Sequence, residues 1–329
     1  MPYTFLFLLT FLMTLILTVT AIRILLPILR RHHVGQRILE IGPAWHNQKS
    51  GTPTMGGTSF VIACFLSLAV TGALLFEDLP ALFWRPMLLT LLFALGNAAI
   101  GAVDDISKFR KKQNEGLTPG QKLVLQLALA AAYIALLSLY GYLDTTVYIP
   151  YLDRAWDLGA FYYLPALLFA VGLVNFVNLT DGIDGLAASC GLVYAAFFAI
   201  AATLLDEAPT MLLATAMMGA CLGFLFYNKH PARIFMGDTG SLFLGGMGVG
   251  CGFLLGNPLL TMVVGGVFVL EGASVILQVG WYKLTGRRLF LMAPLHHHLE
   301  KKGMSEERIV LLFVLLGIAF ALLAIPGLT

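Results

Sequence analysis

Residues 3–29 read YTFLFLLTFLMTLILTVTAIRILLPIL, an almost unbroken apolar run that is followed by Arg30 and Arg31. A helix of about 20 apolar residues is long enough to cross the hydrocarbon core of a bilayer. The run has no basic residue before it, and it is longer than the apolar region of a typical cleavable signal peptide. We therefore expect a membrane-spanning helix, and the positive-inside rule places its arginine-flanked end in the cytoplasm.

Nine further apolar runs follow along the 329-residue chain. The hydrophobic fraction of 59%, the charged fraction of 12% and the mean hydropathy of +0.86 exclude an ordinary soluble domain. A backbone in lipid must satisfy its own hydrogen bonds, so the runs are predicted to be helices. The expected spans are 3–29, 56–76, 86–103, 121–141, 160–177, 187–205, 210–227, 241–256, 258–282 and 307–325. The sequence predicts an all-α integral membrane protein with about ten transmembrane helices in one domain, 1–329.

Charge is distributed unevenly over the gaps between these runs. All seven histidines and eighteen of the twenty Lys and Arg residues lie in alternate gaps or at the span ends beside them. Alternate gaps share one side of a membrane, which is predicted to be the cytoplasmic side, with both termini outside. We expect the active site on this cytoplasmic face and a small hairpin around Thr145–Ile149 on the other. The net charge of +2 gives no reason to expect a nucleic-acid partner.

The first cytoplasmic gap ends with Lys49-Ser-Gly-Thr-Pro-Thr-Met-Gly-Gly57. Its glycines permit close approach of the backbone to a ligand, and Lys49 can meet a phosphate as a point charge. Lys49 and Thr54 are therefore candidates for substrate binding. The alternative is a basic loop that only follows the positive-inside rule, with Thr54 or Thr58 capping the next helix.

The third gap begins with two adjacent carboxylates, Asp104 and Asp105, followed by Lys108. Acids at a helix C-terminus are disfavoured by the helix dipole, so a structural role would use them poorly. Mg²⁺ is a hard ion that binds one or two carboxylates together with phosphate oxygens. We expect these three residues to take part in a magnesium and phosphate site. The alternative is a solvated helix end paired with the nearby lysines.

The fifth gap has almost no positive charge but is rich in amides and acids. Asn175, Asn178 and Asp181 recur every three residues, and Asp184 follows between two glycines. On a helix this spacing makes one polar stripe. Amide and carboxylate groups together suit recognition of a base or a sugar edge. The alternative is hydrogen bonding between helices by the two asparagines.

The seventh gap runs from Asn228 to a glycine-flanked acid, Asp238, immediately before a helix. The N–H groups of a helix N-terminus can face an anion, and an acid there can hold a metal ion. Phe235 is a candidate for stacking on a base. The alternative is that Asp238 is only the N-cap of the helix.

The ninth run and the gap after it contain unusual polar residues. Glu271 and Gln278 lie seven residues apart, on nearly the same helix face, and are expected to bond neighbouring helices or to mark a bent helix. His296, His297 and His298 are consecutive, so their side chains diverge and do not suit a tetrahedral zinc site. Binding of phosphate or pyrophosphate fits them better, and a solvated cluster is the alternative.

The predicted cytoplasmic face thus combines carboxylates, basic residues, amides and glycine-rich turns. Phosphoryl transfer requires positioning and charge neutralisation more than covalent chemistry. These groups suit magnesium-dependent transfer that involves a diphosphate. One substrate can come from the lipid, because the site lies at the membrane interface. A non-catalytic lipid transporter is less well supported, because transporters tend to place such residues at the membrane midplane.

The strings GTPTMGG, Asp104–Asp105 with Lys108, NxxNxxDGxDGLA, IFMGDTGSL and PxHHHxE closely resemble the cytoplasmic motifs of the phospho-N-acetylmuramoyl-pentapeptide transferases. That family belongs to the polyprenyl-phosphate N-acetylhexosamine-1-phosphate transferase superfamily. The resemblance covers the whole chain. GTPTMGG and the three histidines distinguish it from sister enzymes that transfer GlcNAc-1-phosphate, which remain the alternative within the class.

The resemblance implies transfer of phospho-MurNAc-pentapeptide from UDP-MurNAc-pentapeptide to undecaprenyl phosphate in the bacterial cytoplasmic (inner) membrane, giving lipid I and UMP. It implies Mg²⁺ as cofactor, held by Asp238, with Asn175 as a second candidate ligand, and it suggests a homodimer. Asp104 and Asp105 match the catalytic acid pair, and His296, His297 and His298 match the histidine motif. Residues that match the uridine pocket are Lys49, Asn178, Asp181, Asp184, Asn228 and Phe235. Both direct attack by the lipid phosphate and a two-step route through an Asp intermediate are open.

Overall fold

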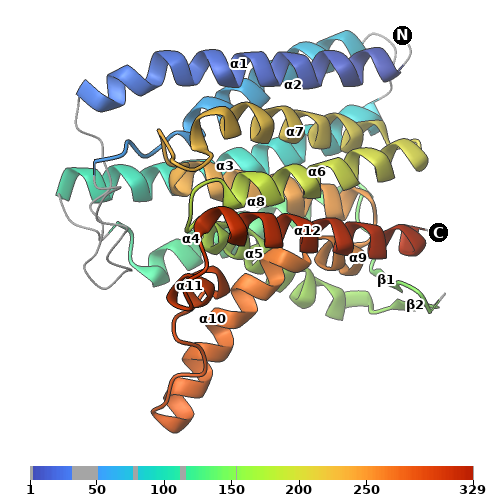
Figure 1. Ribbon diagram of the computed structural model, residues 1–329. Helices are drawn as coiled ribbons and strands as arrows, with labels where there is room; N and C mark the ends of the chain where they lie inside the picture. The colour runs from blue at the N-terminus through green and yellow to red at the C-terminus, as the bar shows by residue number, and fades with distance from the viewer. Residues whose placement is uncertain (1–2, 32–50, 77–80, 112–115, 153, 329) are drawn as a thin grey trace.

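The computed structural model describes residues 3–31, 51–76, 81–111, 116–152 and 154–328, and most of these residues are helical (Figure 1). In chain order the α-helices are α1 (Tyr3–Arg31), α2 (Gly57–Phe76), α3 (Ala81–Lys111), α4 (Pro119–Leu139), α5 (Tyr163–Thr180), α6 (Leu186–Leu204), α7 (Ala208–Asn228), α8 (Gly237–Leu254), α9 (Pro258–Val264), α10 (Gly266–Thr285), α11 (Leu295–Lys301) and α12 (Glu306–Ala324). Two short 3-10 helices are η2 (Gly159–Tyr162) and η3 (Ile325–Leu328), and the strands are β1 (Thr146–Ile149) and β2 (Arg154–Asp157).

The expected all-α membrane architecture is confirmed. Within the described residues, nine helical segments are long and apolar enough to cross a membrane. The eighth expected run corresponds to α8, which is not one of the nine because its glycines and Asp238 lower its hydropathy. The expectation of one continuous helix over 258–282 is wrong, because α9 ends at Val264 and α10 begins at Gly266. The glycines at this junction favour a helix end over a helix interior.

Helix α8 lies in the centre of the bundle, between α3 and α5, and is almost entirely buried. A methyl group added to Gly246 would lie 2.8 Å from the Cα of Ala94 in α3, and one added to Gly245 would lie 2.7 Å from the Cα of Val174 in α5. Small residues allow helix backbones to approach this closely. The glycines of α8 therefore place its first turn beside the ends of α3 and α5.

Both ends of the chain lie on the same side of the bundle, since α1 begins and α12 ends there (Figure 1). The predicted hairpin lies on this side as well. β1 pairs with β2 in antiparallel register, with Thr146 opposite Asp157 and Ile149 opposite Arg154. The hairpin is thus confirmed, and its place outside the cell stays a prediction.

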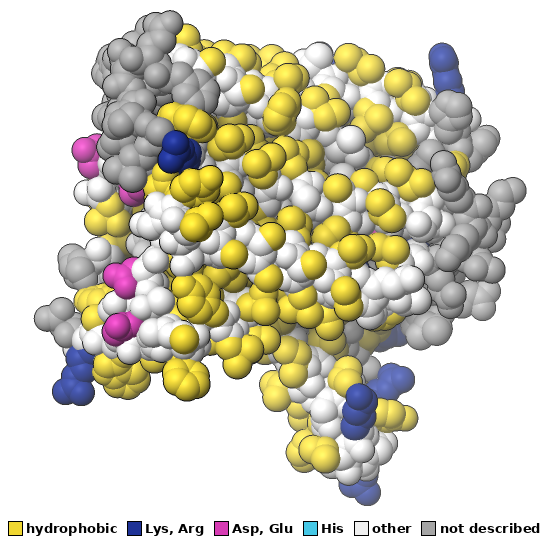
Figure 2. Space-filling model, turned by 180° about the vertical axis from the view of Figure 1, so that it is seen from behind, with side chains coloured by type: hydrophobic (Ala, Val, Ile, Leu, Met, Phe, Trp, Pro, Cys, Tyr) yellow, Lys and Arg dark blue, Asp and Glu magenta, His cyan; other side chains and the backbone are white. Residues whose placement is uncertain are grey.

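Helix α10 leaves the bundle at a steep angle, and its tip projects beyond the other helices (Figures 1 and 2). Its outer half exposes apolar side chains such as Ile276 and Leu284, and Lys/Arg side chains gather at the tip. The chain then turns back along the helix. Gln278 holds the returning segment, because its Oε1 accepts the N–H groups of Leu289 and Phe290 at 3.0 and 2.8 Å.

Candidate active site

Three carboxylates from two helices meet at the end of the bundle opposite the chain termini. Asp104 and Asp105 belong to α3, and Asp238 belongs to the first turn of α8. One oxygen of each lies within 4.8 Å of the others. Asp104 and Asp105 are buried, and Asp238 is half-buried. These three residues are named the acid centre, and nearby cations and hydrogen-bond donors reduce the repulsion between them.

Two lysines and one amide hold the acid centre. Lys108 Nζ lies 2.6 Å from Asp104 Oδ2 and 3.2 Å from Asp238 Oδ2. Lys122 Nζ, from the first turn of α4, lies 2.9 Å from Asp238 Oδ2 and donates to Asn178 Oδ1 at 3.2 Å. The Asn178 amide donates to Asp238 Oδ1 at 2.9 Å. Asp238 is therefore fixed by groups from α3, α4 and α5.

Asp105 has a different environment from Asp104, because both of its oxygens bond to the start of α8. Oδ1 accepts the N–H of Asp238 at 3.1 Å, and Oδ2 accepts the N–H and the hydroxyl of Thr239 at 3.0 and 2.7 Å. The first N–H groups of a helix have no partner within it, and a carboxylate is favoured at that end. Asp105 thus caps α8, and the alternative that Asp238 is the N-cap is wrong.

The donor set of the acid centre fits a hard divalent cation. Mg²⁺ is usually held by one or two carboxylates, with waters and substrate phosphates completing its shell. Asp238 and Asp104 share Lys108, whereas Asp105 is committed to the backbone of α8. Asp238 and Asp104 are therefore the two residues of this centre best placed to hold such an ion.

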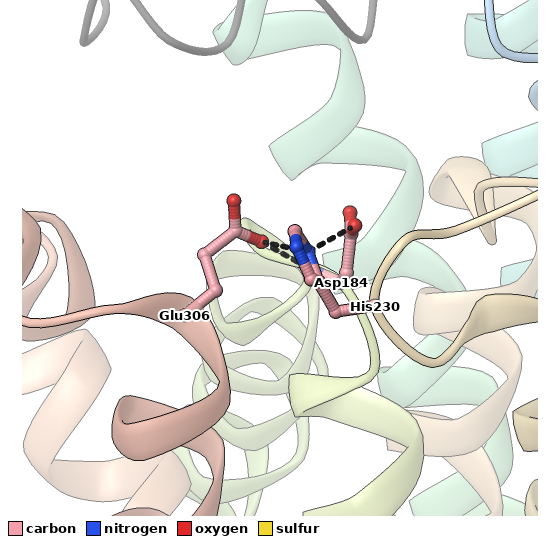
Figure 3. A group of neighbouring side chains, drawn as sticks. All are labelled: Asp184, His230 and Glu306. Atoms are coloured by element: carbon pink, nitrogen blue, oxygen red, sulfur yellow. Dashed lines mark hydrogen bonds and ion pairs between the residues drawn. The ribbon is translucent and has the colours of Figure 1, made fainter.

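A second cluster surrounds the turn 181–185 between α5 and α6, which is named the acidic turn. Figure 3 shows Asp184, His230 and Glu306 converging from three parts of the chain. Asp184 Oδ2 lies 3.0 Å from His230 Nδ1 and accepts the N–H of Ala232 at 3.0 Å. The N–H of Asp184 donates to Glu306 Oε2 at 3.2 Å, and this oxygen lies 3.7 Å from His230 Nδ1. The network joins the acidic turn to the α7–α8 loop and to the start of α12.

The α7–α8 loop is anchored on both of its sides. The buried Asn228 accepts the N–H of Gly185 at 3.1 Å and donates to the carbonyl of Ile234 at 2.9 Å. The N–H of Phe235 donates to the Pro53 carbonyl at 2.7 Å, and its own carbonyl accepts the N–H of Gly56 at 2.8 Å. Phe235 and Thr54 keep partly exposed side chains in this arrangement.

The three histidines of α11 have three different partners. His296 is fully buried, and its Nδ1 lies 2.8 Å from Glu271 Oε2 of α10. His297 Nδ1 lies 2.6 Å from Glu300 Oε2, one turn along the same helix. His298 Nδ1 accepts the N–H of Leu291 at 3.1 Å. The backbone donor fixes the neutral tautomer of His298 with its proton on Nε2.

Two titratable groups of this region lie outside the apolar helices and have shifted pKa values. Desolvation raises the pKa of Asp181 well above its ordinary value, and the charges of Asp238, Asp105 and Asp184 raise it further. Desolvation also lowers the pKa of His298, and the charge of Lys302 adds to this effect. The Asp181 shift places the acidic turn within electrostatic reach of the acid centre.

Most of the predicted site residues gather at this end of the bundle. One set of contacts links Asp104, Asp105, Lys108, Asn178 and Asp238. In a second set, Asn228 bonds to Gly185, which follows Asp184 in the acidic turn. Lys49 lies outside the described residues. Asn175 lies almost one turn from Asn178, and its amide donates a hydrogen bond to Gln126 Oε1 at 2.9 Å. Asn178 is thus the amide that bonds to Asp238.

Lys122, His230 and Glu306 were not predicted from the sequence. Lys122 had a usable signal, because it is a lysine within the predicted span 121–141, where a charge is expensive. His230 and Glu306 are distant in the chain, and no local pattern connects either with Asp184.

Comparison with known proteins identifies relatives over nearly the full length of the chain. The family model described as glycosyl transferase family 4 matches residues 87–255, which include the acid centre and the acidic turn. A protein of Shouchella clausii is 46% identical over 321 residues, covering 96% of this chain and 97% of its own. Proteins of Halalkalibacterium halodurans and Bacillus subtilis are 43% and 42% identical, covering 97% and 96% of this chain and 96% of their own lengths. All three are named phospho-N-acetylmuramoyl-pentapeptide-transferase.

Proposed function

The chain belongs to the phospho-N-acetylmuramoyl-pentapeptide transferase family, and we propose from this membership that it transfers phospho-MurNAc-pentapeptide from UDP-MurNAc-pentapeptide to undecaprenyl phosphate. The chain is an enzyme of peptidoglycan synthesis and a multi-pass membrane protein. The proposed products are lipid I and UMP, and the proposed location is the bacterial cytoplasmic membrane.

The acid centre is the observation that carries this proposal. Its three carboxylates lie at the end of a membrane-embedded bundle, with Lys108 and Lys122 against Asp238. A diphosphate bound there would meet both lysines, and a lipid phosphate can reach the same place from the bilayer. Preorganised charges that face developing negative charge usually contribute most to the rate of such a reaction.

We assign Mg²⁺ binding to Asp238, assisted by Asp104. When bound, Mg²⁺ would neutralise the diphosphate of the nucleotide substrate. Lys122 and Asn178 would hold the Asp238 carboxylate in position for this role. Lys108, which lies between Asp104 and Asp238, would bind the phosphates of the substrate as a cation.

The proposed reaction is a direct displacement. An oxygen of the lipid phosphate bonds to the β-phosphorus, the bond from that phosphorus to the bridging oxygen breaks, and UMP leaves with this oxygen. Asp104 would orient the lipid phosphate. Its role as a base need only be small, because a phosphate monoester has a second pKa of about 6 and is mostly ionised at pH 7.

The nucleotide end of the substrate is assigned to the acidic turn and the α7–α8 loop. Asp181 would face the uridine, and Phe235 would stack on its base. The buried Asp184 and Asn228 would hold the turn to the loop. Lys49 and Thr54 are also proposed to contact the nucleotide substrate. His297 and His298, which are half-buried on α11, are the candidates for contact with the diphosphate.

Substrate competition tests which transferase this is. Purified protein is given UDP-MurNAc-pentapeptide, a polyprenyl phosphate and Mg²⁺, and excess UDP-GlcNAc is added. The proposal predicts that formation of the lipid-linked MurNAc product continues with little inhibition. Efficient transfer from UDP-GlcNAc would instead favour the sister enzyme class.

A further inference from the structure

Glu271 is the only acidic residue of α10, and its side chain is fully buried. An ionised carboxylate inside a membrane helix is costly unless it is paired. Both of its oxygens contact a single residue of another helix. Oε1 accepts the backbone N–H of His296 at 3.1 Å, and Oε2 lies 2.8 Å from His296 Nδ1. Glu271 therefore fixes both the backbone and the ring orientation of His296.

The opposite edge of the His296 ring lies against the acidic turn. His296 Nε2 is buried and has no hydrogen-bond partner among the described residues. A methyl group added to Gly182 would overlap this Nε2 and would lie 2.7 Å from Cε1. Only glycine fits at position 182 while the ring holds this place. The imidazole thus contacts Glu271 of α10 on one side and Gly182 of the acidic turn on the other.

The other two histidines of α11 do not make this connection in the part of the chain that the structure describes. His297 pairs with Glu300 of its own helix, and His298 pairs with the backbone of Leu291. Among the contacts of the described residues, His296 has one ring nitrogen on α10 and the other against the acidic turn. Its burial also keeps it away from direct contact with a substrate phosphate.

We propose that Glu271 and His296 form a rigid spacer that sets the position of the acidic turn. Both would be positioning residues for the nucleotide half of the substrate. This inference rests on the proposed function, because it takes Asp181 of the acidic turn as the residue that faces uridine. It predicts that disturbing the contact between His296 and Gly182 weakens nucleotide binding more than it slows the chemical step.

A double-mutant cycle tests the spacer. Gly182→Ala should push the turn away from the ring and raise both the Kd for UMP and the KM for the nucleotide substrate by about tenfold or more, with a smaller change in kcat. His296→Asn keeps an amide near the position of Nδ1, so that it can still donate to Glu271, and removes the ring edge. The double variant should bind UMP more tightly than Gly182→Ala alone, because the clash is gone. Gly172→Ala is the matched control, because Gly172 lies in α5 with open space around it, and it should leave the Kd for UMP and the KM unchanged.

The outcomes separate the spacer from the proposed function. If the wild type neither binds UMP nor turns over, the proposed function fails. If the wild type is active but the effects of the two substitutions on Kd simply add, the spacer is wrong. Should Gly182→Ala not fold, Glu271→Gln serves instead, because it retains the shape and removes one acceptor. A raised KM with a nearly normal kcat and thermal midpoint supports the spacer, and an unchanged KM overturns it.

Discussion

Lys122 and Asp238, which are 116 residues apart in the chain, form an ion pair of 2.9 Å between the first turns of α4 and α8. Glycines let α8 lie close to α3 and α5, and α4 packs against the same two helices, so the acid and the lysine lie near each other. Lys122 also bonds to Asn178, which holds the other oxygen of Asp238. One lysine thus connects α4 and α5 to the proposed metal ligand.

Replacement of Lys122 should therefore impair catalysis strongly. Lys122→Ala is expected to lower kcat by about 100-fold, as for loss of one preorganised group that stabilises charge in the transition state. Lys301→Ala, which removes an exposed lysine of α11, is the control and should leave kcat within twofold, about 0.4 kcal/mol. Steady-state UMP release measures both. An unaltered kcat for Lys122→Ala would remove this lysine from the site.

Substitution of Asp105 should lower the stability of the protein, because its carboxylate caps α8. Asp105→Ala leaves buried N–H groups of α8 without acceptors and should cost about 1–3 kcal/mol of stability. Its thermal midpoint in detergent should fall clearly, whereas Glu307→Ala, at an exposed acid in the first turn of α12, should barely change it. A stable but inactive Asp105→Ala protein would contradict the capping role.

Direct displacement predicts that no covalent sugar-phosphate adduct forms on the enzyme. Asp105 is occupied by the backbone of α8, and Asp104 accepts the N–H of Leu117 at 2.7 Å and pairs with Lys108. Acid quenching of protein mixed with nucleotide substrate alone, followed by mass spectrometry of its peptides, should show unmodified Asp104 and Asp105. An adduct that forms without lipid and disappears when lipid phosphate is added would establish the two-step route.

His298 should make the contact between α11 and the returning segment sensitive to pH. Its pKa in the folded protein lies below the ordinary value of 6.5, so the neutral ring is favoured by folding. The stability from this group is complete above about pH 6.5 and is lost as the pH falls through the lower folded pKa. The thermal midpoint of the wild type should fall more between pH 7 and 5 than that of His298→Asn, which keeps an acceptor for Leu291 but does not titrate. Equal falls would show that His298 has no part in this dependence.

The sequence predicted the helical membrane fold and the composition of the acid centre, because long apolar runs and acids at their ends are local patterns. It did not predict Lys122. A charge inside a predicted span is a signal for function, but a lysine at the start of a span also fits the role of an orientation charge. The break at Gly265 was also missed, because the apolar run continues across it. The pairing of Glu271 with His296 depends on how α10 and α11 cross, and no spacing in the chain encodes that crossing.

The different partners of Asn175 and Asn178 also depend on helix packing that the sequence does not encode. Both asparagines belong to the repeat that ends at Asp181, and the family resemblance named Asn175 as the second candidate metal ligand and placed Asn178 in the uridine pocket. Packing against α4 distinguishes them, because Gln126 accepts from Asn175 while Lys122 donates to Asn178. Of the two asparagines, it is Asn178 whose amide bonds to Asp238.

Release of UMP by the purified protein is the decisive measurement for the proposed transfer. UDP-MurNAc-pentapeptide, a polyprenyl phosphate and Mg²⁺ are supplied, and the wild type is compared with Asp238→Asn. We expect UMP release that requires both the lipid phosphate and Mg²⁺, and a loss of about 100-fold or more in Asp238→Asn. Absence of UMP from the wild type, or UMP release that Asp238→Asn leaves unchanged, would contradict the proposed transfer.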